Sequence, residues 1–328
     1  MKIKKVFILI IFLCLFLGAC TLENKQKNKT VRLCEVTRSV FYAPQYVALE
    51  LGYFKENGLD ISLNSADGSD KAMTAVLAHQ ADIALLGSAA ALSVCSQGKE
   101  SCPVLFSQIT KKDGSFIVGR NNENFSFENL KGKEVIAGRR GGVPEMVFEH
   151  ILKKLGVYKD VKINKSIKFE LMGAAFGRGI GDYVCLFEPT ASTLKKEKSF
   201  YILKPLSSEC ENISYTAYCA MPDYIKENPE VIRAFTNAIY KAQVWIKTHS
   251  AGEISKLIIP YFVDCSPEIL TSCIENYISC DVWCENPVIK EKELDFLEDI
   301  MLQAGELKEK IDFNRLVENK FAYESLGS

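Results

Sequence analysis

Four short turns carry most of the residues suited to binding a small molecule. Each joins a predicted strand to a predicted helix, and they are residues 36–44 (VTRSVFYAP), 85–91 (LLGSAAA), 137–145 (AGRRGGVPE) and 186–192 (LFEPTAS). Ligands of open α/β sheets bind outside the carboxyl ends of the strands, where free amides and positive helix ends point outward. Two turns come early and two come later, so we predict that all four face one cleft between two lobes.

The glycines of the third turn do not form a known phosphate-binding motif. A P-loop needs GxxxxGK followed by Ser or Thr, and a dinucleotide site needs GxGxxG; the stretch GRRGGVPEM that begins at Gly138 contains neither. We interpret Gly138, Gly141 and Gly142 as places where the backbone approaches a ligand. A tight turn without a ligand is the alternative.

Glu188 narrows the chemistry of the ligand. It follows an apolar strand and precedes Pro189, so its carboxylate is expected at the mouth of the cleft. A carboxylate there would repel a sulfonate or nitrate, but it would accept the N–H groups of an aminopyrimidine or another nitrogen heterocycle. Two alternatives stay open, since Glu188 equally suits a cap of the next helix or a partner of an arginine.

Aromatic and basic residues of the same turns point to opposite ligand chemistries. Phe41 and Tyr42 in the first turn, and Tyr215 farther along, suit stacking on a planar ring, although such residues often only edge a core. Arg139 and Arg140 suit a phosphate or carboxylate instead, and pairing of one of them with Glu188 or Glu145 is the alternative. Arg38 is a further polar candidate. The predicted ligand-binding residues are Arg38, Phe41, Tyr42, Gly87, Ser88, Arg139, Gly141, Gly142, Glu188 and Tyr215.

The N-terminus indicates export. Lysines at positions 2, 4 and 5 precede an apolar run over 6–19, which is shorter than the roughly 20 residues of a membrane span and is typical of a signal peptide. The run ends in LGAC, which resembles the bacterial lipobox, so Cys20 is predicted to carry a lipid; an ordinary signal with an incidental cysteine is the alternative. Residues 20–30 are polar and are predicted to be a flexible tether to the extracytoplasmic face of the membrane.

Composition excludes some classes of protein. The 328 residues are 48% apolar with a net charge of −1, which indicates a globular body and does not favour a nucleic-acid partner. Of twelve cysteines, Cys95 and Cys102 flank a polar loop and are either a disulfide or free thiols. The cysteines at 265, 273, 280 and 284 do not match a zinc spacing, and we expect no metal and no cofactor.

The sequence argues against catalysis. The chain has three histidines, far apart, and it lacks the HExxH and GxSxG motifs. We therefore expect a binding protein rather than an enzyme. A lipoprotein adhesin or sensor that binds no small molecule is a third class.

Strands and helices alternate up to about residue 200, which predicts an α/β fold with mainly parallel sheets. The apolar residues Val231, Phe235, Ile239 and Val244 recur at helical spacing, and the chain from residue 221 is predicted to be mostly helical. The stretch IKFELMG at 167–173 is interpreted as a further strand.

Three stretches together resemble one family. They are FYAPQYVALELGYFKENGLDISL at 41–63, ADIALLGSAAAL at 81–92 and NLKGKEVIAGRRGG at 129–142. Their order resembles extracytoplasmic solute-binding proteins of ABC importers, in the branch that carries aliphatic sulfonates, nitrate or taurine, and thiamine-pyrimidine precursors. The resemblance covers nearly the whole mature chain.

This resemblance implies a two-lobed fold of the type II periplasmic-binding-protein kind, acting as a monomer with a cognate permease and ATPase. We assign residues 31–110 and 214–328 to lobe 1 and residues 111–213 to lobe 2, with hinges near 108–113 and 210–215. We expect a thiamine-precursor pyrimidine or a similar heterocycle as ligand, with sulfonate-type anions as the main alternative. Enzymes that make thiamine pyrimidine share the fold, which keeps an enzyme as the remaining alternative.

Overall fold

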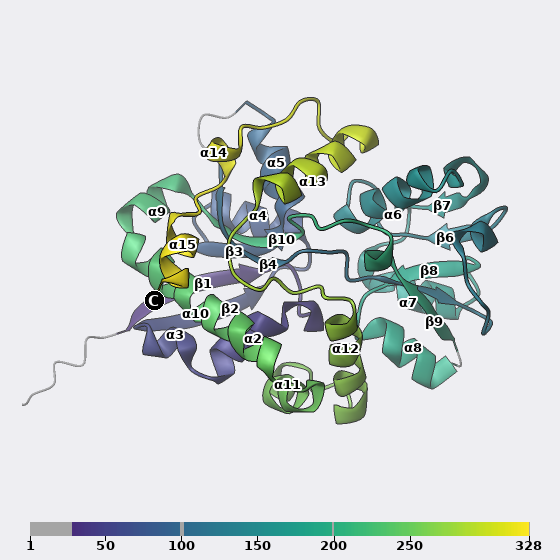
Figure 1. The fold of residues 1–328 in the computed structure, drawn as a ribbon, viewed down its shortest axis with the longest axis horizontal. Helices are drawn as coiled ribbons and strands as arrows, with labels where there is room; N and C mark the ends of the chain where they lie inside the picture. Colours follow the sequence, from purple (N-terminus) through teal and green to yellow (C-terminus); the bar gives the residue numbers. More distant parts are fainter. Residues whose placement is uncertain (1–27, 99–101, 199, 328) are drawn as a thin grey trace, which may run out of the picture.

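The computed structural model describes residues 28–98, 102–198 and 200–327 (Figure 1). The predicted signal peptide, Cys20 and the tether up to residue 27 lie outside the described residues. The first strand begins at Lys29, so residues 29 and 30 of the predicted tether belong to a strand. No helix in the described ranges combines the length and the apolar character needed to cross a membrane.

Lobe 1 is built on a five-stranded sheet with the order β2-β1-β3-β10-β4. The strands β1, β2 and β3 are parallel, and β10 runs antiparallel to both β3 and β4. Every residue of β3 and β10 is buried, as expected for central strands covered on both faces. The bounds are β1 Lys29–Glu35, β2 Leu59–Ser65, β3 Ile83–Gly87, β4 Val104–Thr110 and β10 Thr216–Ala220.

Lobe 2 repeats this plan with the order β7-β6-β8-β5-β9. Here β6 is parallel to β7 and β8, and β5 is antiparallel to β8 and β9. The two-lobed α/β fold is therefore confirmed, but both sheets are mixed rather than mainly parallel, because one strand in each sheet runs against its two neighbours. The bounds are β5 Phe116–Gly119, β6 Glu134–Ile136, β7 Lys162–Asn164, β8 Tyr183–Leu186 and β9 Tyr201–Pro205.

Helices cover both sheets. In lobe 1 they are α2 Ala43–Glu50, α3 Tyr53–Glu56, α4 Ser69–Leu77, α5 Ser88–Cys95, α9 Pro222–Glu227, α10 Pro229–Thr248, α11 Ala251–Ile258, α14 Phe313–Leu316 and α15 Lys320–Leu326. In lobe 2 they are α6 Val143–Lys154, α7 Met172–Gly177 and α8 Thr190–Lys198. Short 3-10 turns are η1 Val40–Tyr42, η2 Phe127–Leu130, η3 Tyr158–Asp160, η4 Phe169–Leu171, η5 Leu206–Ser208 and η6 Ile259–Tyr261. The stretch predicted as a strand at 167–173 forms η4 and the start of α7, with Phe169 and Leu171 exposed, so that prediction was wrong.

Two C-terminal helices lie at the junction of the lobes. The helix α12 (Pro267–Ser279) packs against α8 of lobe 2, and α13 (Glu291–Ala304) packs against α6 of lobe 2 and α5 of lobe 1. Figure 1 shows them on opposite sides of the region where the lobes meet. The C-terminal part of the chain therefore contacts both lobes.

One of the two alternatives for Cys95 and Cys102 is decided. The two cysteines form a disulfide, which joins the end of α5 to the segment before β4. Eight further cysteines in the described ranges are free, and six of these are buried.

Candidate functional site

All four predicted turns meet at the junction of the lobes. Phe41 of the first turn and Phe187 of the fourth lie with their ring centroids 5.4 Å apart. Gly87 of the second turn lies so close to the third that a methyl group added to it would stand 3.6 Å from Val143 Cγ2. The strand ends of the two lobes therefore face each other in contact.

An aromatic cluster fills this junction. We use the name junction cluster for Phe41, Tyr42, Phe187, Tyr215 and Tyr277. Phe41 is at its centre, because its ring centroid lies 5.4 to 5.7 Å from those of the other four. The contacts are tilted or edge-on, an arrangement that aromatic pairs favour. The cluster draws its rings from both lobes and from α12, so separating the lobes must break it.

The first crossover between the lobes runs directly beneath the cluster. This crossover joins β4 to β5 and contains Gly114. A Cβ atom at this position would lie 2.5 Å from Phe41 Cε2 and 3.0 Å from Phe187 Cε1. A glycine is needed here because the two rings pack on the backbone itself.

Asp113 precedes this glycine and is 1% exposed. Its Oδ2 accepts a hydrogen bond of 2.9 Å from the Tyr215 hydroxyl, and its Oδ1 accepts bonds from the backbone N–H (2.8 Å) and the hydroxyl of Ser115. Burial raises the pKa of Asp113, and the hydrogen bonds only partly oppose this effect. Burial also raises the pKa of Tyr215, so burial favours the neutral, protonated form of both groups.

Glu188 lies beside the cluster but is fully engaged with protein groups. Its carboxylate accepts bonds from the N–H (2.9 Å) and hydroxyl (2.8 Å) of Ser192 and from Asn276 Nδ2 (2.6 Å), and the Cys273 thiol lies 3.5 Å away. Ser192 belongs to the first turn of α8, so Glu188 caps that helix, one of the alternatives left open by the sequence. Asn276 belongs to α12, so the same carboxylate also links the C-terminal segment to lobe 2.

The two predicted arginines are paired with carboxylates. Arg38 Nε lies 2.9 Å from the buried Glu35 Oε1, and its guanidinium lies over the ring of Tyr46. Arg139 NH1 lies 3.6 Å from Asp70 Oδ2, and both of these side chains are more than half exposed. The first pair fixes the β1–α2 turn, and the second is an exposed ion pair between the lobes.

The remaining predicted residues have mainly backbone roles. The Ser88 hydroxyl lies 3.0 Å from that of Ser214, and its N–H donates to the Tyr215 carbonyl. Gly141 has φ +74°, a conformation that favours glycine, and a Cβ there would lie 3.2 Å from the carboxylate of Glu306. Gly142 closes the same turn by donating its N–H to the carbonyl of Arg139. Gly141 therefore faces the C-terminal segment, and Gly142 contacts only residues of its own turn.

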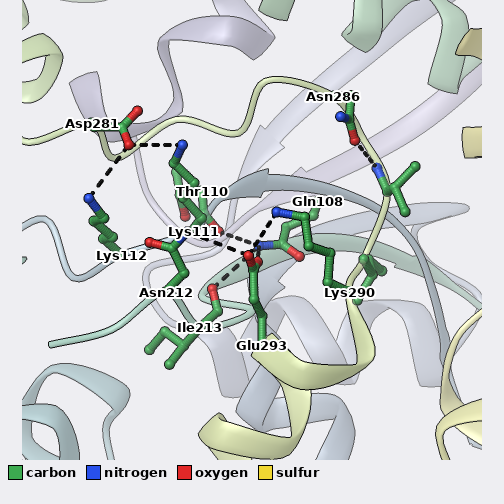
Figure 2. A network of polar contacts seen from close by, with 12 residues as sticks. Gln108, Thr110, Lys111, Lys112, Asn212, Ile213, Asp281, Asn286, Lys290 and Glu293 are labelled. Carbon is green, nitrogen blue, oxygen red and sulfur yellow. Dashed lines mark hydrogen bonds and ion pairs between the residues drawn. The ribbon is translucent and has the colours of Figure 1, made fainter.

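The segment between α12 and α13 forms hydrogen bonds with the crossovers. Trp283 pairs with Thr110 as an isolated β-bridge, and the N–H of Lys111 donates to the carbonyl of Val282. Figure 2 shows the adjoining polar network, in which Glu293 of α13 accepts bonds from Gln108, Asn212 and Lys290. In the same view, Lys111 and Lys112 pair with Asp281. A third segment therefore accompanies the two predicted hinges.

A groove among the described residues lies away from the junction. An open groove of about 660 Å³ lies between α3 and α10, lined by Tyr53, Asn57, Asn237, Tyr240, Lys241, Val244, Trp245 and Thr248. None of the four turns contributes to this groove, so we place the candidate site at the junction. Within the described ranges no three His, Cys, Asp or Glu side chains gather in a way that would hold a metal ion.

Sequence reasoning missed three residues of the site. Phe187 stands inside the fourth turn next to Glu188, so its position could have been noticed. Tyr277 comes from a helix far along the chain, and no local pattern marks it. Asp113 was included only in a predicted hinge, although DGS at 113–115 is a recognisable turn sequence.

Comparison with known proteins identifies the family. The family model described as NMT1/THI5 like matches residues 40–251, well over half of the chain. The chain belongs to the NMT1/THI5-like family. This match includes residues 40–44 of the first turn, the other three turns and both crossovers, so the family relationship covers most of the candidate site but not Tyr277.

Three relatives of this NMT1/THI5-like protein differ in what their names describe. YtlA of Bacillus subtilis (strain 168), named provisionally as a binding protein, is 40% identical over 315 residues, 95% of this chain and 94% of YtlA. The 4-amino-5-hydroxymethyl-2-methylpyrimidine phosphate synthase of Candida albicans (strain WO-1) is 23% identical over 240 residues, 68% of each protein. The periplasmic aliphatic sulphonate binding protein SsuA of Escherichia coli has a TM-score of 0.69 at 13% identity, covering 88% of this chain and 96% of SsuA. This last likeness shows the fold alone, which is that of periplasmic solute-binding proteins.

Proposed function

We propose that this protein is the solute receptor of an ABC importer, and that it binds a planar nitrogen heterocycle of the thiamine-precursor pyrimidine class between its lobes. The observation that carries the proposal is the junction cluster, where Phe41 of lobe 1 meets Phe187 of lobe 2 at 5.4 Å. A planar ring entering between open lobes would replace these contacts with stacking on the same aromatic faces. The lobes would close over the solute by bending at the two crossovers that join them.

The charges at the junction favour a heterocycle over an anion. Arg38 and Arg139 are each paired with a carboxylate, at 2.9 Å and 3.6 Å. Asp113 adds a buried carboxyl group to the same region, and among the described residues it has no basic partner. A sulfonate or nitrate would enter beside this carboxyl group, and repulsion in a poorly hydrated site is strong.

The names of the relatives support the two parts of the proposal separately. YtlA is described as a binding protein, which favours a receptor without catalysis. The Candida albicans relative is a synthase of an aminopyrimidine phosphate, which favours a pyrimidine as the bound molecule and keeps an enzyme as the second candidate. As a receptor of an importer, the protein would be held by the lipid on Cys20 at the extracytoplasmic face of the cell membrane, where a permease accepts the solute.

Thermal-shift titration of the mature chain tests this function. We expect 4-amino-5-hydroxymethyl-2-methylpyrimidine to raise the unfolding temperature, with about 2.7 kcal/mol of stabilisation at a hundred times its dissociation constant. Taurine, ethanesulfonate and nitrate are the competing ligands. Stabilisation by these anions alone would contradict the proposal, and conversion of the pyrimidine, detected by mass spectrometry, would favour the enzyme.

Two matched variants locate the binding. Phe41→Leu removes the central ring of the junction cluster and should weaken pyrimidine binding about tenfold, the equivalent of one aromatic contact. Phe54→Leu removes a buried ring from the lobe 1 core, where Phe54 packs on Phe235, and should lower stability without changing affinity. Equal loss of affinity in both variants would argue that the site lies elsewhere.

A further inference from the structure

Asp113 is a buried carboxyl group whose hydrogen-bond partners are all neutral. Its three bonds come from Ser115 and the Tyr215 hydroxyl. Among the described residues no lysine or arginine is an ion-pair partner of Asp113, since the nearby Lys111 and Lys112 pair with Asp281 instead. A buried carboxylate without a cationic partner is costly, because its charge is neither hydrated nor compensated.

The other buried carboxyl groups near the junction have their charge compensated. Glu35 is paired with Arg38 at 2.9 Å. Glu293 is paired with Lys290 at 3.0 Å. Glu188 stands at the amino end of α8, where the positive end of the helix stabilises an anion. Asp113 differs from these three because its segment joins two strands and no helix begins there.

The surroundings of Asp113 suit a cation that is also planar. The Tyr215 hydroxyl that bonds Asp113 belongs to a ring 5.5 Å from Phe41. Gly114, the next residue, is the one on which Phe41 and Phe187 pack. Aromatic faces attract organic cations, and the attraction increases when water is excluded. A flat cation could therefore stack on the aromatic rings and donate its N–H groups to the carboxyl group of Asp113.

We propose that Asp113 is the charge-recognition residue of this site and that the solute is a planar organic cation, such as a protonated amino-heterocycle. The proposal rests on the proposed function and makes it more specific. When the lobes open, the solute's ring stacks on the junction cluster and its N–H groups donate to Asp113. The solute brings the positive charge that the folded chain does not provide there.

The titratable groups around Asp113 do not themselves ionise near neutral pH, so a pH dependence of binding reports on Asp113. They are Cys185 of β8, Cys210 and Tyr215 of the second crossover, and Tyr277 of α12. Burial raises the pKa of each of these four groups, so they stay neutral around neutral pH. Burial also raises the pKa of Asp113, so an increase in pH converts it to the anion that a cation requires.

Two small amines of the same shape test the proposal in the intact mature chain. 4-Aminopyridine is a planar cation between about pH 6 and pH 8, and aniline is its neutral counterpart. We expect 4-aminopyridine to raise the unfolding temperature more than aniline does, and its stabilisation to grow with pH. Asp113→Asn should weaken 4-aminopyridine binding about tenfold or more and remove the pH dependence. Glu211→Gln, which removes an exposed carboxylate from the second crossover, is the matched control and should change neither.

Each result decides between the two proposals. Equal stabilisation by aniline and 4-aminopyridine overturns the role of Asp113 and leaves heterocycle binding intact. Stabilisation only by sulfonates or nitrate overturns both proposals. Failure of 4-aminopyridine at every pH overturns the cation proposal, whatever the pyrimidine titration shows. If Asp113→Asn does not fold, the wild-type pH series still decides, because a flat response contradicts recognition by a titrating carboxylate.

Discussion

Asp113 and Glu188 are two buried carboxyl groups beside the same aromatic cluster, yet their surroundings differ. Glu188 caps α8 and accepts bonds from Ser192 and Asn276. Asp113 lies in a crossover and is held by two hydroxyls and one N–H. The comparison teaches that a carboxylate near a cleft is not sufficient to bind a ligand; what matters is how much of its charge the protein already compensates.

Removing Glu188 is the strongest test of this contrast. Glu188→Ala leaves the N–H of Ser192 and the amide of Asn276 without their acceptor, inside a buried region. We expect the free energy of unfolding to fall by about 3 kcal/mol, since bonds to a charged group contribute about 1.5–3 kcal/mol each. Urea denaturation measures the loss.

An exposed residue serves as the control for Glu188. Glu170 lies on the surface of lobe 2, so Glu170→Ala should change the free energy of unfolding by less than about 0.5 kcal/mol. A loss below about 1 kcal/mol for Glu188→Ala would refute its role as a helix cap. Its carboxylate would then be available for a ligand, as the sequence first suggested.

The next effect in size concerns the packing of the first crossover. A Cβ at Gly114 would lie 2.5 Å from Phe41 and 3.0 Å from Phe187, so Gly114→Ala must move both rings. We expect about 2 kcal/mol of destabilisation, typical of overpacking, together with weaker binding of the pyrimidine. Thermal unfolding and the ligand titration check the two parts.

A second glycine separates packing from backbone effects. A Cβ at Gly252 in α11 would meet nothing within 4 Å. Gly252→Ala should therefore leave stability unchanged or slightly raised, because alanine favours helices. If Gly114→Ala behaved like Gly252→Ala, the rings would not pack on the crossover, and Asp113 would lose its connection to the junction cluster.

The sequence predicted the lobes and the turns better than it predicted the site within them. Strand–helix alternation and the family-like stretches led to the observed α/β architecture, because these signals are local. Mixed pairing was missed, since β10 enters its sheet from the second crossover and runs against both neighbours. The wrong strand at 167–173 shows the limit of short apolar patterns, which do not distinguish η4 and α7 from a strand.

The contacts that define the site are long-range, which is why the sequence did not reveal them. Asn276 is 88 positions from Glu188 and still takes its carboxylate. Tyr215 is 102 positions from Asp113, and that bond joins the two crossovers. Glu188 could be selected from its position before a proline, but its availability depended on partners that no local pattern identifies.

The smallest expected effect is the most specific to Asp113, and it concerns stability without any ligand. Burial raises the pKa of Asp113 in the folded chain above the ordinary value of about 3.9 that it has when unfolded. The folded chain therefore holds the proton more tightly. The stability due to this group is complete below the unfolded pKa and is lost as the pH rises through the folded pKa.

Asp113→Asn isolates this titration, because asparagine resembles the protonated acid and does not ionise. Urea denaturation from about pH 4 to pH 8 should show wild type losing stability relative to the variant, by about 1.4 kcal/mol for each unit of raised pKa. Other titrating groups are common to both chains and cancel in the difference. Parallel curves would mean that the folded chain compensates the Asp113 anion by itself, as it does for Glu188. The contrast between the two carboxyl groups would then disappear, and with it the reason for a cationic solute.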